Sequence, residues 1–484
     1  MVGIDLRPVL YIVGALVSIV ALAMLVPMVV DFAVGNPDWM VFATTSALTL
    51  FFGVLLILTN RTSEIALSLR QAFLLTTLAW VVVCAFAAAP FVVSQTRLSV
   101  TDAFFEAMSG LTTTGSTVIA GLEGLPPGLL LWRSLLQWLG GIGIIGMGIV
   151  ILPFLRVGGM QLFRSESSDR SDKVVPRAGD LAIAVAWVYM TMTLMCVAGL
   201  ALAGMSLFDA VNHAMTAVST GGYSTRDASI AGWDNPAVEW VLVVFMMAGG
   251  MPFVRFISLA RGDAGPLWRD TQVRWYVGFL VVVSVALGLW LAHTADIDLH
   301  DAFRLTFFNV VSVVTTTGYA SADYGLWGPL AVAAFFTLTL VGGCTGSTAG
   351  GIKIFRFEIL FMVLRVLMVR LFSRHRVLPL HYNNKPVDAD TMVSVMSFGF
   401  VYIALIFILM VLLAALGLDL VTALTGAATA ISNVGPGLGP IIGPVGNFAP
   451  LPDAAKWLLS LGMLLGRLEF FTVLILFNPA FWRQ

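Results

Sequence analysis

"VVTTTGYA", the stretch from Val313 to Ala320, places three threonines and one glycine among segments that are apolar enough to lie in a membrane. Threonine and glycine are both poor helix formers. Backbone that is not helical needs partners for its N–H and C=O groups, and lipid provides none. Taken alone, the stretch is compatible with a polar kink in a helix, so its meaning depends on whether the pattern recurs.

The same pattern occurs four times along the chain. Aligned on one glycine, the copies read "DAFFEAMSGLTTTGS", "DAVNHAMTAVSTGGY", "LTFFNVVSVVTTTGY" and "TALTGAATAISNVGP", and they begin at Asp102, Asp209, Leu305 and Thr422. The aligned glycines are Gly115, Gly222, Gly318 and Gly435. Four copies at similar intervals form an internal repeat, which argues against an isolated kink.

The composition is that of an integral membrane protein. Of the 484 residues, 59% are hydrophobic and only 11% are charged, and the mean hydropathy is +0.94, far more apolar than a soluble domain. Apolar runs near the length of about 20 residues that a spanning helix needs flank every copy, and two more precede the first. The segment from Met1 to Asp31 is expected to be a retained span, because it is too long for a signal peptide.

The sequence therefore predicts an all-α polytopic membrane protein. Two leading transmembrane helices are followed by four pseudo-fourfold repeats of helix, re-entrant pore loop and helix around a central ion pore. We expect the helix pair at 1–60 and the repeats at 61–160, 161–262, 263–376, which includes an intramembrane glycine-rich loop, and 377–484. These ranges define repeats 1 to 4 below.

The basic residues predict the orientation. Most of the 26 Lys and Arg residues fall in alternate connections, and by the positive-inside rule these connections and both termini are cytoplasmic. The re-entrant segments then lie on the outer side. The basic connections 156–177 and 365–385 could dock a soluble partner, or they could face anionic lipid as topology determinants.

The residues give no support for an enzyme. The three cysteines and five histidines show no metal-ligand spacing, and clustered His, Asp, Glu or Cys groups are not visible. We expect no cofactor and no nucleic-acid partner.

Each re-entrant segment has an internal order of its own. A helix-compatible apolar run precedes a Thr/Ser/Gly tail, which predicts a short helix followed by an extended return. Asp102 and Asp209 stand where they could cap the short helices and suit their dipoles, with ion binding as the alternative; the third copy carries Asp301 one turn earlier. If the four tails face one another, their carbonyls form rings that can replace the water shell of a cation, and glycine permits the backbone angles that this needs.

With T-T-T-G, S-T-G-G, T-T-T-G and S-N-V-G at the aligned positions, the chain resembles the superfamily of Trk, Ktr and HKT potassium transporters. The two leading spans make it similar to the TrkH branch over essentially its whole length. The resemblance implies a single-file K⁺ filter, in which Gly115 favours K⁺ because some sodium-transporting plant relatives have serine there. Asn433 and Val434 replace two threonines in the fourth copy, so only pseudo-fourfold symmetry is expected. The implied filter residues are Thr113, Thr114, Gly115, Thr220, Gly221, Gly222, Thr316, Thr317, Gly318, Asn433, Val434 and Gly435.

The stretch "VGGCTGSTAGG", from Val341 to Gly351, interrupts the last span of repeat 3. Each glycine costs a helix about 1 kcal/mol relative to alanine, so we expect an unwound, movable segment; close packing of small residues between helices is the alternative. Lys353 and Arg356 are expected to reach the cytoplasmic interface. The resemblance implies a gate beneath the filter, formed by Gly342, Gly343, Gly346, Ser347, Thr348, Gly350 and Gly351.

Arg467 stands about midway along the expected last span, in "LLSLGMLLGRLEFFTVLILF". An arginine there costs about 2.5–3.5 kcal/mol on insertion scales, so it should face a cavity or a partner. Glu469 is two residues away and is a poor partner within one helix. We expect a positive charge below the filter, matching the family's "GRLE" motif; an acidic partner on another helix is the alternative.

Together these features predict potassium uptake across a bacterial cytoplasmic membrane, with K⁺ as the transported ion. The alternative is a secondary transporter that couples K⁺ to Na⁺ or H⁺, for which titratable groups near broken helices are expected; Glu106 and Glu469 are the candidates. The resemblance further implies a homodimer and a cytosolic nucleotide-binding partner of the TrkA kind.

Overall fold

The structure is a computed structural model, and it describes residues 4–62, 67–150, 178–373, 380–383 and 385–483. It is built from helices, as predicted. Within the described residues, the one sheet is a two-stranded antiparallel hairpin of β1 (His381–Tyr382) and β2 (Lys385–Pro386).

The leading part of the chain forms the expected pair of spans. α1 (Arg7–Ala23) continues into α2 (Leu25–Ala33) as one span, and α3 (Trp39–Thr59) is the second. α1 packs against α3 and α4. Gly14 and Gly53 allow the close approach of α1 to α3, because a Cβ on Gly14 would lie 2.8 Å from the carbonyl oxygen of Gly53. Small residues serve this purpose at many helix contacts in membranes.

Four repeats of helix, short helix and helix follow. Repeat 1 contains α4 (Leu69–Ala87), α5 (Ala89–Val93), α6 (Val100–Leu111) and α7 (Pro127–Val150). Repeat 2 contains α10 (Ala178–Leu202), α11 (Leu207–Val218), α12 (Pro236–Gly249) and α13 (Phe253–Ala260), and repeat 3 begins with the short α14 (Gly265–Arg269). Repeat 3 contains α15 (Thr271–Thr294), α16 (Leu299–Val314), α17 (Pro329–Thr339) and α18 (Ile354–Phe372). Repeat 4 contains α19 (Ala389–Ala415), α20 (Leu420–Ser432), α21 (Asp453–Arg467), α22 (Phe471–Leu474) and α23 (Pro479–Trp482). Short 3₁₀ turns lie at Leu122–Gly124, Ser229–Trp233, Tyr324–Leu326 and Ile475–Phe477.

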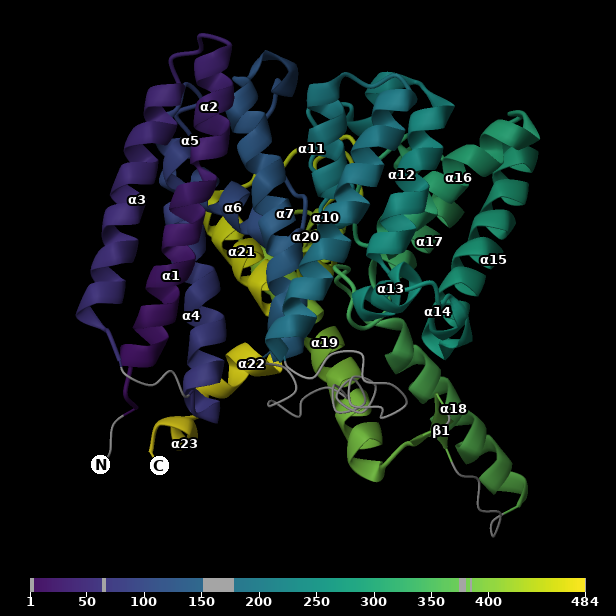
Figure 1. Cartoon of the computed structure of the whole chain (residues 1–484). Helices are drawn as coiled ribbons and strands as arrows, with labels where there is room; N and C mark the ends of the chain where they lie inside the picture. Colours follow the sequence, from purple (N-terminus) through teal and green to yellow (C-terminus); the bar gives the residue numbers. More distant parts are fainter. Residues whose placement is uncertain (1–3, 63–66, 151–177, 374–379, 384, 484) are drawn as a thin grey trace.

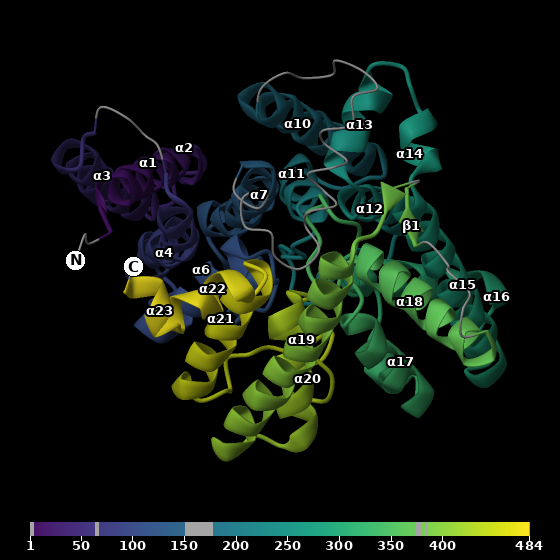
Figure 2. The same ribbon diagram turned by 90° about the horizontal axis from the view of Figure 1, so that it is seen from below.

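The repeats close into a ring. In each repeat the short pore helix (α6, α11, α16 or α20) packs against the long helix before it and the helix after it. The helix after it also packs against the next pore helix, through α7 on α11, α12 on α16, α17 on α20 and α21 on α6. Figure 2 shows the four repeats grouped around one centre, with α1 to α3 outside them. Ring order therefore follows chain order.

Within the described residues, seven helices are long and apolar enough to cross a membrane, or up to nine if each bent helix pair is one span. The remaining expected span is divided by the glycine-rich segment into α17 and α18. Both chain ends lie near the lower end of Figure 1, below the level of α13 and α14. The chain is thus a multi-pass membrane protein whose termini share one side.

Two spans that the sequence suggested as continuous are sharply bent. α12 and α13 meet at 104°, and α21 and α22 meet at 107°. The first break falls at "GMP", from Gly250 to Pro252, where glycine and proline both end helices. At the second, Glu469 has a φ of 56°. Arg467 is accordingly the last residue of α21 and does not lie midway along a continuous helix, as the apolar run had suggested.

The predicted caps of the first two pore helices are corrected by the structure. The side chains that accept from the free amides belong to Ser99 and Ser206, three residues before Asp102 and Asp209. Each aspartate lies in the first turn and accepts a hydrogen bond from the serine hydroxyl, at 2.9 Å in α6 and 2.8 Å in α11. The carboxylates still suit the helix dipole, but serine is the cap. α16 is longer than α6 and α11, with Asp298 as its cap and Asp301 in its first turn.

Candidate ion pore

All four pore helices end in the same hydrogen-bond pattern. In repeat 1 the N–H of Thr113 donates to the carbonyl of Gly110 (3.0 Å), and the N–H of Thr114 donates to the carbonyl of Ser109 (2.8 Å). This is a Schellman ending, which pairs free carbonyls at a helix C-terminus. The same two bonds end the other pore helices, with donors at Thr220 and Gly221, Thr316 and Thr317, and Asn433 and Val434.

The Schellman ending has an unusual residue at its left-handed position. Glycine is the common residue there, but the four positions have φ values of 53°, 52°, 58° and 56° and are occupied by Thr113, Thr220, Thr316 and Asn433. A β-branched residue at positive φ is an outlier and costs about 1–3 kcal/mol. Asn433 is one of the few non-glycine residues that adopt this conformation readily, so the strain is confined to the three threonines, where its repetition in register marks the tails as more than ordinary turns.

Two residues later the backbone turns left-handed again. The aligned glycines have φ values of 90°, 79°, 83° and 109°, at Gly115, Gly222, Gly318 and Gly435, and the residue between the two left-handed positions does not share the positive φ. In a regular strand successive carbonyls point to opposite sides. Alternating handedness brings them toward one side, which is the arrangement that a row of ion ligands needs.

The four aligned glycines, called here the glycine ring, contact one another in a closed cycle. A Cβ on each glycine would collide with the carbonyl oxygen that precedes the glycine of the next repeat. Gly115 faces the oxygen of Gly221, Gly222 that of Thr317, Gly318 that of Val434, and Gly435 that of Thr114, the last at 2.7 Å. Because the fourth contact returns to repeat 1, the tails surround a common axis, and a side chain at any of the four positions would enter a space held by backbone.

Most carbonyls of the tails are available to an ion. In the tails 113–115, 220–222, 316–318 and 433–435, only two carbonyls accept a hydrogen bond from the described residues: that of Gly221 from Gln137 and that of Gly435 from Ser116. After the glycine, Tyr223 and Tyr319 have carbonyls that accept from hydroxyls of their own pore helices at 2.9 Å and 2.7 Å. The carbonyl of Ser116 accepts from the Tyr223 hydroxyl at 3.2 Å, so in repeats 1, 2 and 3 the row of free carbonyls does not continue past the ring glycine.

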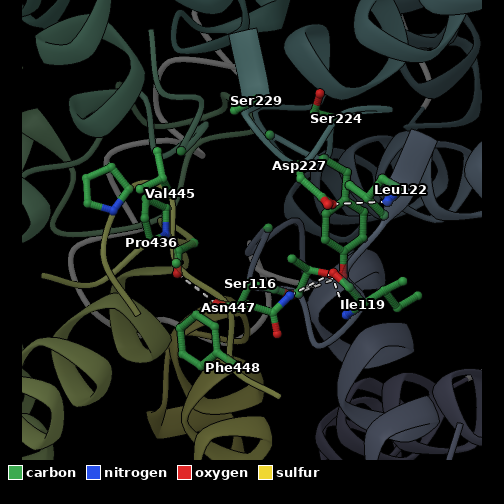
Figure 3. A pocket seen from close by; sticks show the side chains of 18 of the residues that line it. Ser116, Ile119, Leu122, Ser224, Asp227, Ser229, Pro436, Val445, Asn447 and Phe448 are labelled. Atoms are coloured by element: carbon green, nitrogen blue, oxygen red, sulfur yellow. Dashed lines mark hydrogen bonds between the residues drawn. The ribbon is translucent and has the colours of Figure 1, made fainter. Parts of the chain in front are cut away.

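A cavity of about 200 Å³ lies on one side of the glycine ring, and all four ring glycines line it. Figure 3 shows Pro436 and Val445 of repeat 4 on the side of the cavity opposite Ile119 of repeat 1, whereas Asn447 of repeat 4 donates directly to the carbonyl of Ile119 at 2.7 Å. Asp227 of repeat 2 accepts from the amides of Gly121 (2.7 Å) and Leu122 (3.1 Å). These bonds join the walls of repeats 1 and 2 at the mouth of the cavity.

The glycine-rich loop, residues 342–351 between α17 and α18, lies at the other end of the tails. The N–H of Gly350 donates to the hydroxyl of Thr316 (2.7 Å), and the hydroxyl of Thr220 donates to that of Thr348 (3.1 Å). The N–H of Gly351 donates to the carbonyl of Ser432 (2.8 Å). The loop thus contacts repeats 2 and 4 as well as the pore helix end of its own repeat.

The break between α12 and α13 receives the same loop. The carbonyl of Gly250 accepts from the N–H of Cys344 (2.8 Å), and that of Gly249 accepts from the hydroxyl of Thr348 (3.0 Å). The N–H of Phe253 donates to the carbonyl of Gly346 (3.0 Å). The broken helix of repeat 2 therefore supplies partners to an unwound segment of repeat 3. Sequence reasoning missed this contact, although "GGMP" in an apolar run was a signal for it.

Arg467 reaches the loop from repeat 4. Its side chain is buried, and Nη1 donates to the carbonyl of Thr348 at 2.7 Å. Nε and Nη2 have no hydrogen-bond partner among the described residues. The alternative that Arg467 pairs with an acidic side chain on another helix finds no support in the ion pairs of the described residues.

Lys353 and Arg356 do not reach the interface in the way the sequence suggested. The Lys353 ammonium turns back and donates to the carbonyl of Ala349 in the loop. Arg356 is 1% exposed, pairs with Glu469 and lies 3.5 Å from the ring centre of Phe398. Both cations are therefore held next to the loop, because buried carbonyl and carboxylate oxygens offer them partners inside the protein.

Glu106 and Glu469, the acidic candidates for ion coupling, are both occupied. Glu106 is fully buried and bonds Nε of Arg133 at 2.8 Å and the N–H of Val118 at 2.9 Å. Glu469 pairs with Arg356. Arg133 also donates to the carbonyl of Ser224 at 2.9 Å, so the Glu106 pair ties repeat 1 to repeat 2 behind the tails.

The structure thus brings all expected filter residues together around the glycine ring, and it places the expected gate residues with Arg467 at one end of them. Their roles in conduction and gating stay predictions. A closed ring of four re-entrant segments inside a polytopic helical protein defines a class of membrane protein, that of pore-loop ion-permeation proteins.

Comparison with known sequences narrows that class. The TrkH family of cation transport proteins matches residues 38–484. The chain belongs to this family, whose members are transporters and not enzymes. It is 48% identical to the Trk system potassium uptake protein TrkI of Halomonas elongata, over 99% of this chain and 97% of the relative. It is 35% identical to the Trk system potassium uptake protein TrkH of Escherichia coli, over 99% of each.

The fold is shared with a solved relative. The crystal structure of the potassium transporter TrkH from Vibrio parahaemolyticus matches with a TM-score of 0.92 and 33% identity, over 99% of this chain and 100% of that chain. The family and the all-α repeat architecture predicted from the sequence are thereby confirmed.

Proposed function

We propose that this protein takes up K⁺ across the bacterial cytoplasmic membrane through the glycine ring and the tails that end in it. The observation that carries the proposal is the closed cycle in which each ring glycine faces a carbonyl of the next repeat. Relatives of similar length that are named potassium uptake proteins support the choice of ion. Both termini would then be cytoplasmic, in line with the positive-inside rule.

The chemistry of the tails suits a dehydrated cation. Free carbonyl oxygens replace the water shell of the ion, and the pore helices direct the partly negative ends of their dipoles to the same place. The strained threonines are held in the left-handed conformation by the hydrogen bonds that end their pore helices, which fixes the direction of the tails. In repeat 4, Asn433 donates to the hydroxyl of Thr114 (2.9 Å) and to the carbonyl of Met463 (2.9 Å), so its side chain braces the ring where a threonine is missing.

The glycine-rich loop and Arg467 would act as the gate of this pore. The loop lies across one end of the tails, and its hydrogen bonds to Thr220, Thr316 and Ser432 hold it there. Arg467 adds a buried positive charge whose donors are only partly satisfied among the described residues. Such a charge raises the energy of a cation at the same level. Opening would require the loop to release the tails and Arg467 to move away with α21.

A nucleotide-binding cytosolic subunit of the TrkA kind and a homodimeric arrangement complete the proposal, on the strength of the resemblance to the TrkH branch. The basic connections are the candidate docking surface, with anionic lipid as the competing partner. The connection 156–177 lies outside the described residues. Copurification of a soluble partner with the wild-type chain, and its loss when Arg365 and Arg370 are changed to Gln, would favour docking over lipid binding.

Coupling of K⁺ to Na⁺ or H⁺ finds no specific support in the geometry, because Glu106 and Glu469 are both held in ion pairs. Uptake of ⁸⁶Rb⁺ into proteoliposomes without any Na⁺ or pH gradient is expected to follow the K⁺ potential alone. Uptake that stops unless one of these gradients is imposed would instead favour coupled transport.

The decisive test of the filter is Gly115→Ser. Gly115 has a φ of 90°, and a Cβ at this position would collide with the carbonyl of Gly221. The preference for K⁺ over Na⁺ should therefore fall. Gly35→Ser is the matched control, since Gly35 also has positive φ (72°) but has nothing within 4 Å of its Cβ position. Unchanged K⁺/Na⁺ flux ratios for Gly115→Ser would refute the filter proposal.

A further inference from the structure

The tail of repeat 2 differs from the others at the residue before the ring glycine. Gly221 stands where the other repeats have Thr114, Thr317 and Val434. Its φ does not lie in the left-handed region, so the backbone conformation does not call for glycine. Glycine is required here for steric reasons, because a Cβ on Gly221 would collide with the side chain of Gln137.

Gln137 comes from α7 of repeat 1 and is fully buried. Its Nε2 donates to the carbonyl of Gly221 at 2.6 Å, and its Oε1 accepts from the N–H of Tyr223 at 3.0 Å. The two bonds use both ends of the amide, and exchanging its oxygen and nitrogen would set donor against donor and acceptor against acceptor. The orientation of Gln137 is therefore determined by the tail that it holds.

In repeats 1 and 3 a threonine hydroxyl occupies the corresponding place. The hydroxyl of Thr114 lies 2.7 Å from that of Thr112, and the hydroxyl of Thr317 lies 2.7 Å from that of Thr315. These pairs join each tail to the end of its own pore helix. Repeat 2 has Ser219 at the helix end but no hydroxyl at position 221, so the join is supplied from the neighbouring repeat.

The carbonyl that Gln137 holds is one of the contacts that close the glycine ring. It is the oxygen that Gly115 faces, and therefore it lies between the tails of repeats 1 and 2. A hydrogen bond to a buried carbonyl limits how far that oxygen can move. In a ring of ligands, such movement changes the size of ion that fits best.

We propose that Gln137 is a positioning residue of the ion filter, replacing the threonine that repeat 2 lacks and fixing the carbonyl of Gly221 against Gly115. This inference rests on the proposed function of the glycine ring. It assigns a selectivity role to a residue outside the T-T-T-G motifs. A purely structural role, in which Gln137 only satisfies buried backbone groups, would affect stability but not discrimination between ions.

The first experiment compares Gln137→Met with the wild type and with Gln71→Met. Methionine keeps the length of the side chain and removes both hydrogen bonds. Gln71 is a matched control, because it is also buried and its Nε2 donates to a backbone carbonyl, that of Asp5, at 2.6 Å, far from the ring in sequence and fold. The readout is the ratio of K⁺ to Na⁺ flux in proteoliposomes, normalised to the amount of folded protein.

Gln137→Met should lower this ratio by about three- to tenfold, and Gln71→Met should leave it unchanged. An unchanged ratio for Gln137→Met overturns the inference. If Gln137→Met does not accumulate in the membrane, Gln137→Asn is measured by the same criterion, since its shorter stem cannot reach both Gly221 and Tyr223.

The second experiment tests whether Gln137 and Gly221 share one space. Gly221→Thr alone should reduce K⁺ flux by more than about tenfold, whereas the double change Gly221→Thr with Gln137→Ala should recover flux to within about threefold of wild type, since the new hydroxyl can approach that of Ser219. A double variant no better than Gly221→Thr contradicts the replacement.

Gly115→Ser in the same assay separates the two proposals. If it alters the K⁺/Na⁺ ratio while Gln137→Met does not, the filter proposal stands and the positioning role is rejected. If Gly115→Ser also leaves the ratio unchanged, the filter proposal itself fails.

Discussion

The glycine ring and the glycine-rich loop are both rich in glycine, yet they are held in different ways. Each tail of the ring is bonded to the end of its own pore helix, as in the bond from Thr114 to Ser109. The loop is bonded to other elements, among them Gly250 of repeat 2, Ser432 of repeat 4 and Arg467 of α21. A shift of α21 against the pore helices would break the bond of Arg467 to the loop, whereas the bonds that join each tail to its own pore helix would move with that helix. The difference suits one part to stay fixed and the other to move.

The largest effect should come from filling the ring. Gly222 has a φ of 79°, which alanine rarely adopts, and the Cβ that Gly222→Ala adds would collide with the carbonyl of Thr317. K⁺ uptake should therefore fall more than about a hundredfold, a factor equivalent to about 2.8 kcal/mol. Complementation of a strain that lacks K⁺ uptake systems, titrated over external K⁺, measures this. Gly35→Ala is the control. If Gly222→Ala supports growth at low K⁺ as well as Gly35→Ala does, the ring tolerates a side chain, and the contrast between a fixed ring and a movable loop is lost.

Releasing the loop should raise the ion flux, whereas filling the ring lowers it. Arg467→Ala removes the bond to Thr348 and the positive charge near it, so flux without any soluble partner should rise by about tenfold, the factor that corresponds to about 1.4 kcal/mol. Arg467→Lys keeps the charge and should lie between the two. The measurement is the initial rate of ⁸⁶Rb⁺ uptake into proteoliposomes. A loss of flux in Arg467→Ala would mean that the arginine supports conduction and does not close the pore.

A smaller effect is expected from one hydroxyl. Thr316→Val removes the acceptor of the Gly350 amide, and an unpaired buried N–H costs about 1–3 kcal/mol. Amide hydrogen exchange of peptides covering 342–351 should speed up. Thr113→Val is the matched control, because the equivalent hydroxyl of repeat 1 has no partner among the described residues. Equal acceleration in both variants would contradict a specific hold of repeat 3 on the loop.

The smallest effect on transport should come from the outer contacts of the ring. Lys456→Met breaks the 2.6 Å pair with Asp102 that joins repeat 4 to repeat 1. We expect a melting temperature lower by a few degrees, the shift that corresponds to about 1 kcal/mol or more, and an unchanged K⁺/Na⁺ ratio. Thermal unfolding in detergent and the flux assay together check this. A changed ratio would show that the outer contacts influence the tails.

The ring and loop could be located from the sequence because both break a strong pattern. Four copies of a Thr/Gly tail within apolar spans predicted Gly115 and its three counterparts, and "GGCTGSTAGG" predicted the division of α17 from α18. Periodicity could not show the bends after α12 and α21, since an apolar run reads the same whether straight or folded back. For that reason Arg467 was expected within a helix and was found at the end of one.

The partners of buried polar residues were the least predictable part. Arg356 was expected at an interface because it follows the loop in a basic segment, but Glu469 and Phe398 hold it inside. Gln137 gave one usable signal, a polar side chain in the apolar run "LLLWRSLLQWLGG", because intramembrane polar groups usually have a purpose. Its partner could not be inferred, since it lies on the tail of another repeat.

The cyclic order of the glycine ring has a consequence for biogenesis. The last contact joins Gly435 to the carbonyl of Thr114, so the ring cannot close until repeat 4 has left the ribosome. At translation rates of about 5–20 residues per second, repeat 1 waits for about 15–65 s with its polar tail unmatched in the membrane. During this interval Thr112 and Thr114 can satisfy each other, and the insertion machinery must shield the remaining open edge. A nascent chain stalled before repeat 4 is thus a membrane protein with a partly built wall, and a natural substrate for quality-control proteases.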